Sequence, residues 1–236
     1  EAFDARGTTT LLRTFWTALE TLFSNQTPNS PRENVVNSLL PIIQKTYILK
    51  NLRAVHSQLC HAIEQQELKK LGIASFEGFV LYFSEHTENS VEMKKIYEHL
   101  PQNPLLRTRL FSLRKALADG KNITAFLDSH RTRIEWQIKR LYRMRNVATH
   151  LGVEISGIDI AANHLHNYFD YVVNYMLCKS ENGDYVISTA AVVFEAKNDN
   201  RIHAEMLKEN QPLSANNYIA YLFGPDSNLV KYQFEY

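Results

Sequence analysis

The chain has 236 residues, of which 44% are apolar and 11% aromatic, and its formal net charge is +1 at pH 7. These values exclude a disordered chain and leave enough apolar material for a sizeable core. The two cysteines, Cys60 and Cys178, exclude a disulfide-built scaffold and favour a reducing, cytoplasmic compartment. No apolar run approaches the roughly 20 residues of a bilayer-spanning helix, so no membrane segment is expected.

The first predicted element is an amphipathic helix that follows the threonines at 8–10 and ends before Pro28. Apolar side chains recur in it at spacings of three and four residues, as one face of a helix requires. They are Leu11, Leu12, Phe15, Trp16, Leu19, Leu22 and Phe23. Residues 32–70 also carry a broad apolar face, which predicts one long helix or two, kinked near Pro41 and ended by Gly72.

Several shorter helices are expected next, with ends marked by proline, glycine and polar capping residues. Their approximate ranges are 75–86, 90–99 with Asn89 or Ser90 as the N-cap, and 104–118; residues 124–150 continue the helical pattern.

A second core helix is expected after Gly157, because Ser156 to Asp159 has the form of a capping box. It runs to the turn at 181–184. The remaining expectations are a possible strand at 185–187, a helix at 190–208 broken at 198–200, and a last turn or two at 213–223. Since no repeat and no long linker interrupts the chain, a single all-α domain over residues 1–236 is the simplest architecture.

Charge is distributed unevenly along the chain. Residues 104–150 contain 11 Lys and Arg against three Asp and Glu, whereas residues 1–103 contain 10 against 11 and residues 151–236 contain five against 11. A positive segment between acidic flanks favours a polyanionic ligand at one face, because Lys and Arg neutralise phosphates. The alternative is a solvated helix face made of Arg131, Arg133, Lys139, Arg140 and Arg143.

Within this positive segment, residues 140–152 combine arginines, an amide and an imidazole. At about 100° per residue, Arg143, Asn146 and His150 fall within some 60° of one another, whereas Arg145 lies about 140° from His150. Three arrangements would bring Arg145 and His150 to one site. The helix loosens before His150, the long Arg145 side chain reaches round, or a second copy of the chain completes the site across a two-fold axis.

These residue types suit cleavage of RNA through its own 2′-hydroxyl without a metal. The reaction needs a base, an acid for the leaving 5′-oxygen, and cations for the pentacoordinate phosphate. Histidine supplies the proton transfers, arginine binds phosphate oxygens with its planar fork, and asparagine can orient the imidazole or hold a phosphate oxygen. The candidate catalytic residues are Arg145, Asn146 and His150, the candidate substrate-binding residues are Arg140, Tyr142 and Arg143, and no metal or cofactor is required.

Other interpretations of these residues stay open, since a single histidine on a helix is more often structural than catalytic. Glu20 lies one turn after Trp16 at the edge of an apolar stripe, where a carboxylate is usually exposed; if it is partly buried, an arginine partner is expected. His164 and His166 point to nearly opposite sides of a helix and make a poor metal pair. A metal-dependent nuclease is not favoured, because residues 104–150 contain only three acids.

The residues from Tyr142 to His150 resemble the signature of HEPN domains, in which Arg, a polar residue, three further residues and His form the active motif. The stretches 141–146 and 15–22 are similar to the ApeA-like branch. That branch is found in bacterial antiviral proteins as a C-terminal helical domain behind an unrelated N-terminal region. Since the first residue is Glu1 rather than Met, we expect the chain to be the C-terminal part of a longer protein.

The resemblance covers residues 8–24 and 104–178 and implies a HEPN-like helical bundle, with residues 30–100 and 185–236 as accessory helices. It also implies a homodimer through the motif helices and a composite, metal-independent endoribonuclease site in the cleft. Arg145 and His150 would be the catalytic pair, Asn146 the intervening polar residue and Glu20 a supporting residue.

The expected products carry a 2′,3′-cyclic phosphate and a 5′-hydroxyl. We therefore predict a cytoplasmic ribonuclease that acts on RNA, with tRNA as one candidate, as the effector of an antiviral or toxin-like defence system of the abortive-infection kind. Some HEPN domains lack activity, so the alternative is a non-catalytic dimerisation or nucleic-acid-binding module.

Overall fold

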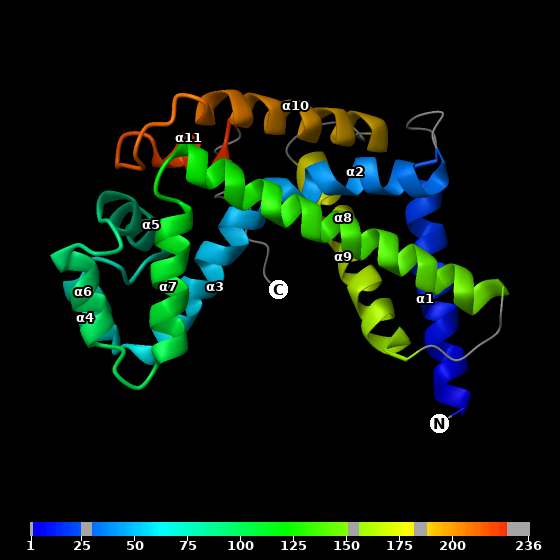
Figure 1. The fold of residues 1–236 in the computed structure, drawn as a ribbon, viewed down its shortest axis with the longest axis horizontal. Helices are drawn as coiled ribbons and strands as arrows, with labels where there is room; N and C mark the ends of the chain where they lie inside the picture. Colours follow the sequence, from blue (N-terminus) through cyan, green and yellow to red (C-terminus); the bar gives the residue numbers. More distant parts are fainter. Residues whose placement is uncertain (1, 25–29, 151–155, 182–187, 226–236) are drawn as a thin grey trace. The chain divides into compact units, whose positions relative to one another are not determined.

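The computed structural model describes residues 2–24, 30–150, 156–181 and 188–225, with only the backbone described for 2–6 and 181. The described residues form helices and no strand, which confirms the predicted all-α class (Figure 1). In chain order the helices are α1 (Ala2–Leu22), α2 (Pro31–Lys45), α3 (Tyr47–Ala62), α4 (Gln65–Lys70), α5 (Phe76–Glu85), α6 (Val91–Glu98), α7 (Pro104–Ala116), α8 (Gly120–His150), α9 (Ile158–Glu181), α10 (Thr189–Leu207) and α11 (Tyr218–Phe223).

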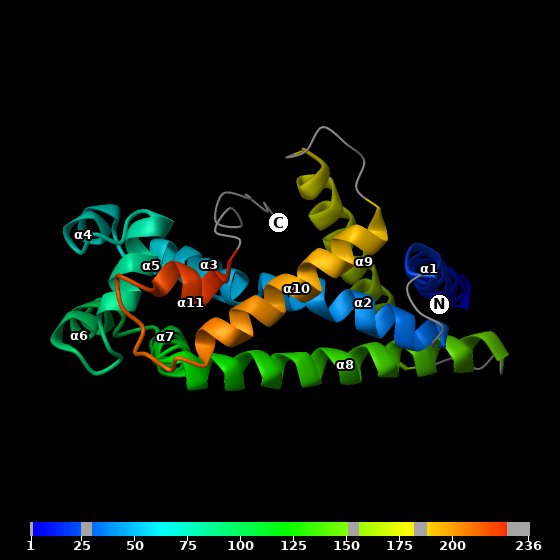
Figure 2. The ribbon, with the colours of Figure 1, turned by 90° about the horizontal axis from the view of Figure 1, so that it is seen from above.

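The chain divides into two compact units that no linker in the sequence marks. The first unit comprises residues 1–44 and 130–198, and the second comprises residues 45–129 and 199–236. α8 and α10 each contribute residues to both units as continuous helices (Figure 2). All candidate site residues predicted from the sequence belong to the first unit.

The first unit is built around the packing of α1 against α9. The inner stripe of α1 is fully buried and consists of Leu12, Trp16 and Leu19, and Phe23, directly after the helix, is fully buried as well. Leu165 and Val172 of α9 are also fully buried, and Phe15 and Phe169 meet with ring centroids 5.9 Å apart. The spacing of three and four residues that predicted the first helix is therefore the spacing of its core contacts. Removal of a ring as buried as that of Trp16 costs about 3–5 kcal/mol.

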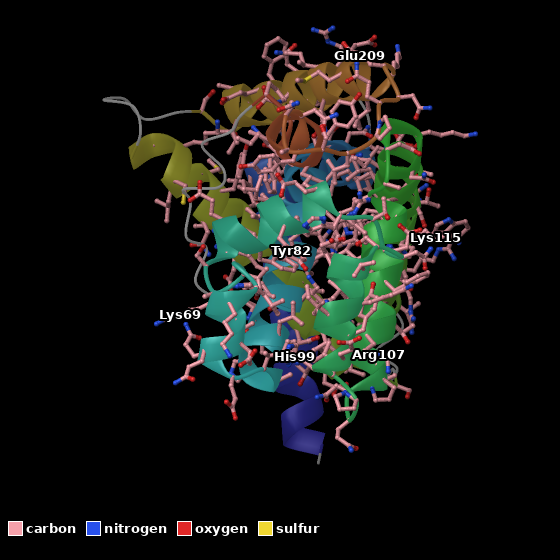
Figure 3. The ribbon with its side chains drawn as sticks, turned by 90° about the vertical axis from the view of Figure 1, so that its left-hand side faces the viewer. Lys69, Tyr82, His99, Arg107, Lys115 and Glu209 are labelled. Carbon is pink, nitrogen blue, oxygen red and sulfur yellow. The ribbon has the colours of Figure 1, made fainter. Side chains whose placement is uncertain are left out.

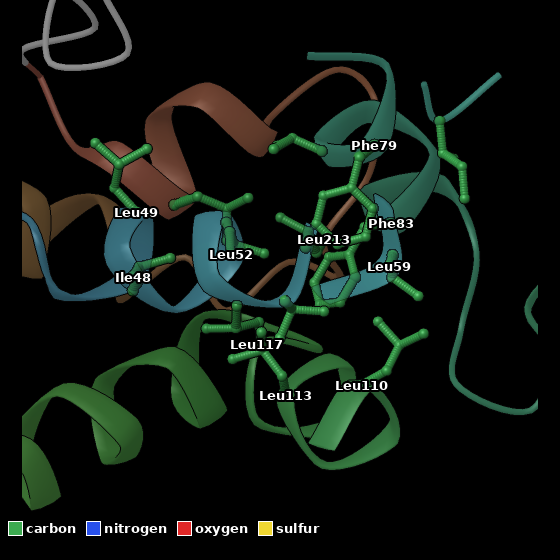
Figure 4. Close-up of a cluster of buried hydrophobic side chains, with 14 of the residues drawn as sticks. Ile48, Leu49, Leu52, Leu59, Phe79, Phe83, Leu110, Leu113, Leu117 and Leu213 are labelled. Atoms are coloured by element: carbon green, nitrogen blue, oxygen red, sulfur yellow. The ribbon is translucent and has the colours of Figure 1, made fainter. Parts of the chain in front are cut away.

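A separate cluster of buried apolar side chains holds the second unit together (Figure 4). It draws on α3, α5, α7 and α11 and includes Ile48, Leu49, Leu52, Leu59, Phe79, Phe83, Leu110, Leu113, Leu117 and Leu213. Arg114 is buried at its edge, where Nε donates to the carbonyl oxygen of His86 at 2.7 Å. Charged side chains such as Lys69, Lys115 and Glu209 lie exposed at the periphery of this unit (Figure 3).

α8 begins at Gly120, a turn earlier than the sequence pattern indicated. Asp119 caps it, because its Oδ1 accepts the backbone amide of Asn122 at 2.8 Å. Only glycine fits at position 120, since a Cβ there would lie 2.2 Å from the carbonyl oxygen of Leu207. These contacts fix the start of the helix that carries the motif.

The shorter predicted helices are confirmed as α5, α6 and α7. Ser90 rather than Asn89 caps α6, because its hydroxyl accepts the amide of Met93 at 3.2 Å. α4 ends at Lys70, two residues before Gly72, whose φ of +73° suits glycine.

α2 continues through Pro41 to Lys45, so no helix boundary falls at the position of the predicted kink. Proline removes the hydrogen bond to the carbonyl of residue 37, but Asn37 is exposed, so its carbonyl remains open to water. The chain breaks instead at Thr46, before α3.

Two further boundaries differ from prediction. α10 is not broken at 198–200, where Asp199 forms an ion pair with the buried Lys45. α1 begins at Ala2, before the predicted threonine start signal, because threonines at 8–10 are tolerated inside a helix that packs along α9. The possible strand at 185–187 lies outside the described residues.

Candidate functional site

The motif residues stand on the last turns of α8 (Figure 1). α8 remains α-helical through His150, so the helix does not loosen before that residue. The ideal geometry of a helix therefore separates Arg145 and His150 by about 7.5 Å along the axis and about 140° around it. The two side chains leave different sides of α8, and no described contact joins them.

Arg145 is held by two neighbours in the first unit. Its Nη2 lies 3.5 Å from Oε2 of Glu20 on α1, and its Nη1 donates to Oδ1 of Asn146 at 3.0 Å. The side chains of Arg145 and Glu20 are only 23% and 22% exposed. The arginine partner expected for a partly buried Glu20 is therefore present, and it is the motif arginine.

The guanidinium of Arg145 keeps unused hydrogen-bonding capacity. Its Nε is buried and has no hydrogen-bond partner within the described chain. The 3.5 Å separation from Glu20 also exceeds the roughly 2.7–2.9 Å of a tight charge-assisted hydrogen bond. Glu20 therefore holds the side chain by charge attraction, while the buried Nε keeps an unused donor.

Arg13 makes a contact with α8 that was not predicted from the sequence. Its Nη2 donates to the carbonyl oxygen of Ala148 at 2.5 Å. This bond satisfies a carbonyl in the last turn of α8 and places positive charge at the negative end of the helix dipole. Arg13 and Glu20 are seven residues apart and share one face of α1, so α1 holds the end of α8 at two points. The seven-residue spacing of Arg13 and Glu20 is the feature of the sequence from which this contact could have been predicted.

His150 is exposed, and in the described part of the chain it has no hydrogen-bond partner. It lies on the same face as the exposed Arg143, since residues seven apart on a helix differ by only about 20°. Asn146 is half-buried, and its amide oxygen is bound to Arg145 rather than to His150. An accessible imidazole is thus available five residues beyond the anchored arginine, on a different side of the helix.

The three predicted substrate-binding residues separate into two groups. Tyr142 packs inside the first unit, with its ring centroid 5.2 Å from that of Trp16 and the guanidinium of Arg32 over it at 5.8 Å. Arg140 and Arg143 are exposed and line a pocket that Tyr142 does not reach. The structure therefore brings only the two arginines to a common surface.

That pocket lies between α8 and α9 and has a volume of about 470 Å³. It is lined by Trp136, Gln137, Lys139, Arg140, Leu141, Arg143, Met144, Gly157, Ile160, Ala161 and His164. No acidic side chain is among these described lining residues. Gln137 accepts a hydrogen bond at 2.8 Å from Tyr168, whose pKa is raised by burial, so this hydroxyl stays a neutral donor.

Within the described ranges, the other clusters of titratable side chains do not form a competing site. The Sγ of Cys60 lies 3.5 Å from Nε2 of His56, but burial raises the pKa of this thiol, and the same Nε2 lies 3.0 Å from the carbonyl of Ile73. A protonated thiol is a poor nucleophile. His166 pairs with Asp170 at 3.1 Å. The described residues contain no group of three His, Cys, Asp or Glu able to hold a metal ion.

Comparison with protein-family models, with curated proteins and with solved structures finds no match for this chain. None of the described helices is both long enough and apolar enough to cross a membrane.

Proposed function

We propose that the chain is a metal-independent endoribonuclease domain of the HEPN type, which acts on RNA as a homodimer. The supporting observation is the anchored motif arginine: Arg145 is fixed by Glu20 and Asn146, and the accessible His150 stands five residues further along the same helix, at the end of α8. A fixed guanidinium and an accessible imidazole are the two groups that cleavage through the 2′-hydroxyl requires.

In the proposed reaction, the neutral imidazole of His150 takes the proton of the 2′-hydroxyl while the 2′-oxygen bonds to phosphorus. The bond from phosphorus to the 5′-oxygen breaks, and the protonated imidazole of His150 in a second copy gives its proton to that oxygen. Arg145 stabilises the charge on the pentacoordinate phosphate. The products are a 2′,3′-cyclic phosphate and a 5′-hydroxyl, with no net oxidation and no metal.

The proposal requires a second copy because of the helix geometry. With about 140° and 7.5 Å between Arg145 and His150, one straight helix does not aim both groups at one phosphate. A two-fold axis beside the ends of two α8 helices brings two arginines and two imidazoles to one groove. Cytoplasmic action as a defence effector belongs to the same proposal.

The test is cleavage of RNA in EDTA, with analysis of the fragment ends. The wild-type chain should produce cyclic phosphate and 5′-hydroxyl ends, and His150→Ala should abolish them. His61→Ala is the matched control, because His61 is an exposed histidine at the end of α3 in the second unit. Intact RNA with the wild-type chain, or undiminished cleavage by His150→Ala, would contradict the proposal.

A second candidate is a nucleic-acid-binding module without catalysis. It is favoured by the pocket that Arg140 and Arg143 line and by the ion pair that occupies Arg145. This candidate predicts salt-dependent RNA binding that His150→Ala leaves unchanged, together with no cleavage by the wild-type chain.

A further inference from the structure

We infer that the pocket between α8 and α9 is a base-binding subsite for single-stranded RNA. A nucleobase stacks on Trp136, and Arg140 and Arg143 bind the adjoining phosphates. The inference rests on the proposed function and narrows its substrate to unpaired RNA. It also gives a role to Trp136, which is not explained by packing.

The exposure of Trp136 is the first argument. Its side chain is 66% exposed, although tryptophan is usually well buried, and across the pocket Ile160 of α9 is 58% exposed. The pocket volume of about 470 Å³ lies in the range of small-ligand sites, which is roughly 300–1,000 Å³. An exposed flat ring at a pocket of this volume, with apolar side chains in its lining, is suited to a planar, partly apolar ligand such as a base.

The charge of the lining is the second argument. Arg140 and Arg143 follow Trp136 by four and seven residues, so the three side chains share one face of α8. Neither arginine has an acidic partner in the described part of the chain, whereas Lys139 is paired with Glu135 at 2.5 Å. Aromatic stacking combined with unpaired cations is how proteins hold single-stranded nucleic acid.

The position of the pocket relative to the motif is the third argument. Arg143 and Arg145 leave α8 about 160° apart, so the pocket is distinct from the cluster around Glu20. The exposed stripe that contains Trp136, Arg140 and Arg143 continues instead through Val147 to His150, about 10 Å beyond Arg143 along the axis. A strand bound in the pocket is thereby led along α8 to the imidazole. Bases inside a duplex are already stacked on one another and cannot enter.

Intrinsic fluorescence provides a direct test, because the chain has two tryptophans and Trp16 is fully buried. In the His150→Ala background and in EDTA, binding is measured without turnover. A single-stranded oligoribonucleotide of about ten nucleotides should quench Trp136 emission, and the same sequence as a duplex should not. Equal quenching and equal affinity with the duplex would overturn the inference.

Affinity, measured by anisotropy of a labelled oligoribonucleotide, tests the ring itself. Trp136→Ala should weaken binding at least about five-fold, and Trp136→Phe should retain most of it because phenylalanine still stacks. The logarithm of the association constant falls as the logarithm of the salt concentration rises. Arg140→Ala and Arg143→Ala should each make this slope less steep by about 0.7. The control is Arg131→Ala, which removes the same charge from an exposed position of α8 outside the pocket; it should leave the quenching unchanged.

The outcomes separate the subsite from the proposed function. Trp136-dependent binding by a wild-type chain that never cleaves RNA would refute the nuclease and leave the subsite standing. Cleavage that is insensitive to Trp136→Ala, with unchanged RNA affinity, would refute the subsite alone. If Trp136→Ala instead dissociates a dimer in sedimentation while RNA affinity is unchanged, a second copy covers the pocket and the inference fails.

Discussion

The ion pair between Glu20 and Arg145 should couple the two residues measurably in the stability of the first unit. Two unit charges 3.5 Å apart attract by about 5 kcal/mol at an effective dielectric constant of 20. Desolvation of two side chains that are only 22–23% exposed offsets most of that attraction, and their immobilisation offsets more. We expect a net coupling free energy of about 1–2 kcal/mol, which lies between the values for exposed and buried pairs.

A double-mutant cycle with Glu20→Gln, Arg145→Gln and the double variant measures this coupling. Urea unfolding followed by tryptophan fluorescence reports the first unit, because Trp16 and Trp136 both belong to it. The control is the cycle on Glu135 and Lys139, a pair 2.5 Å apart whose side chains are 36% and 37% exposed, so its coupling should stay below about 1 kcal/mol.

The kinetics of the same variants distinguish a role of Glu20 in positioning Arg145 from a role in stability alone. Glu20→Gln should lower kcat about 10- to 100-fold, because a misplaced guanidinium loses transition-state contacts, while KM changes little. If the two substitutions are additive in stability and Glu20→Gln leaves kcat unchanged, then Glu20 does not hold Arg145 and the description of the site is wrong.

Three further predictions follow from contacts outside this pair. Arg13→Gln should cost about 1 kcal/mol and speed amide hydrogen exchange around Ala148, because it removes the bond to the last turn of α8; unchanged exchange would contradict this role. Burial lowers the pKa of His203 in the folded chain. As pH falls below about 6.5, this histidine is therefore protonated more readily in the unfolded chain, and the second unit should lose stability. Urea unfolding between pH 8 and 5.5 (roughly the range where histidine titrates), followed by circular dichroism, should show a smaller loss in His203→Gln. Lys45→Ala should cost about 3–5 kcal/mol by leaving Asp199 without its buried partner, whereas Lys45→Met with Asp199→Leu should recover most of that loss in the same unfolding assay.

The helices could be predicted from the sequence because most of them carry their own start signal and apolar stripe. Ser90 and the stripe through Trp16 are examples. A capping side chain binds an amide three residues later, and the buried residues of a helix recur every three or four positions, so both can be recognised in the sequence. Predictions failed where contacts distant in the sequence decide the outcome. α10 passes unbroken through 198–200, where Asp199 pairs with Lys45, a partner 154 residues away.

The candidate site shows the same division. The helix angles between Arg145 and His150, and the need of Glu20 for an arginine once buried, follow from periodicity and charge. The contact of Arg13 with α8 and the exposure of Trp136 depend on how α1, α8 and α9 pack, which spacing alone does not determine. Sequence patterns therefore predicted the helix that carries the motif, and the three-dimensional structure identified the contacts that hold the end of this helix.

Subunit mixing tests most directly the claim that two copies of His150 share one groove. Wild-type chain is exchanged with an equal amount of His150→Ala, and the initial rate of RNA cleavage in EDTA is measured per total chain. If each groove needs both imidazoles, only wild-type pairs are active and the rate falls to about one quarter of the unmixed wild-type rate. A rate of about one half would mean that each chain acts alone, and the composite site would be contradicted.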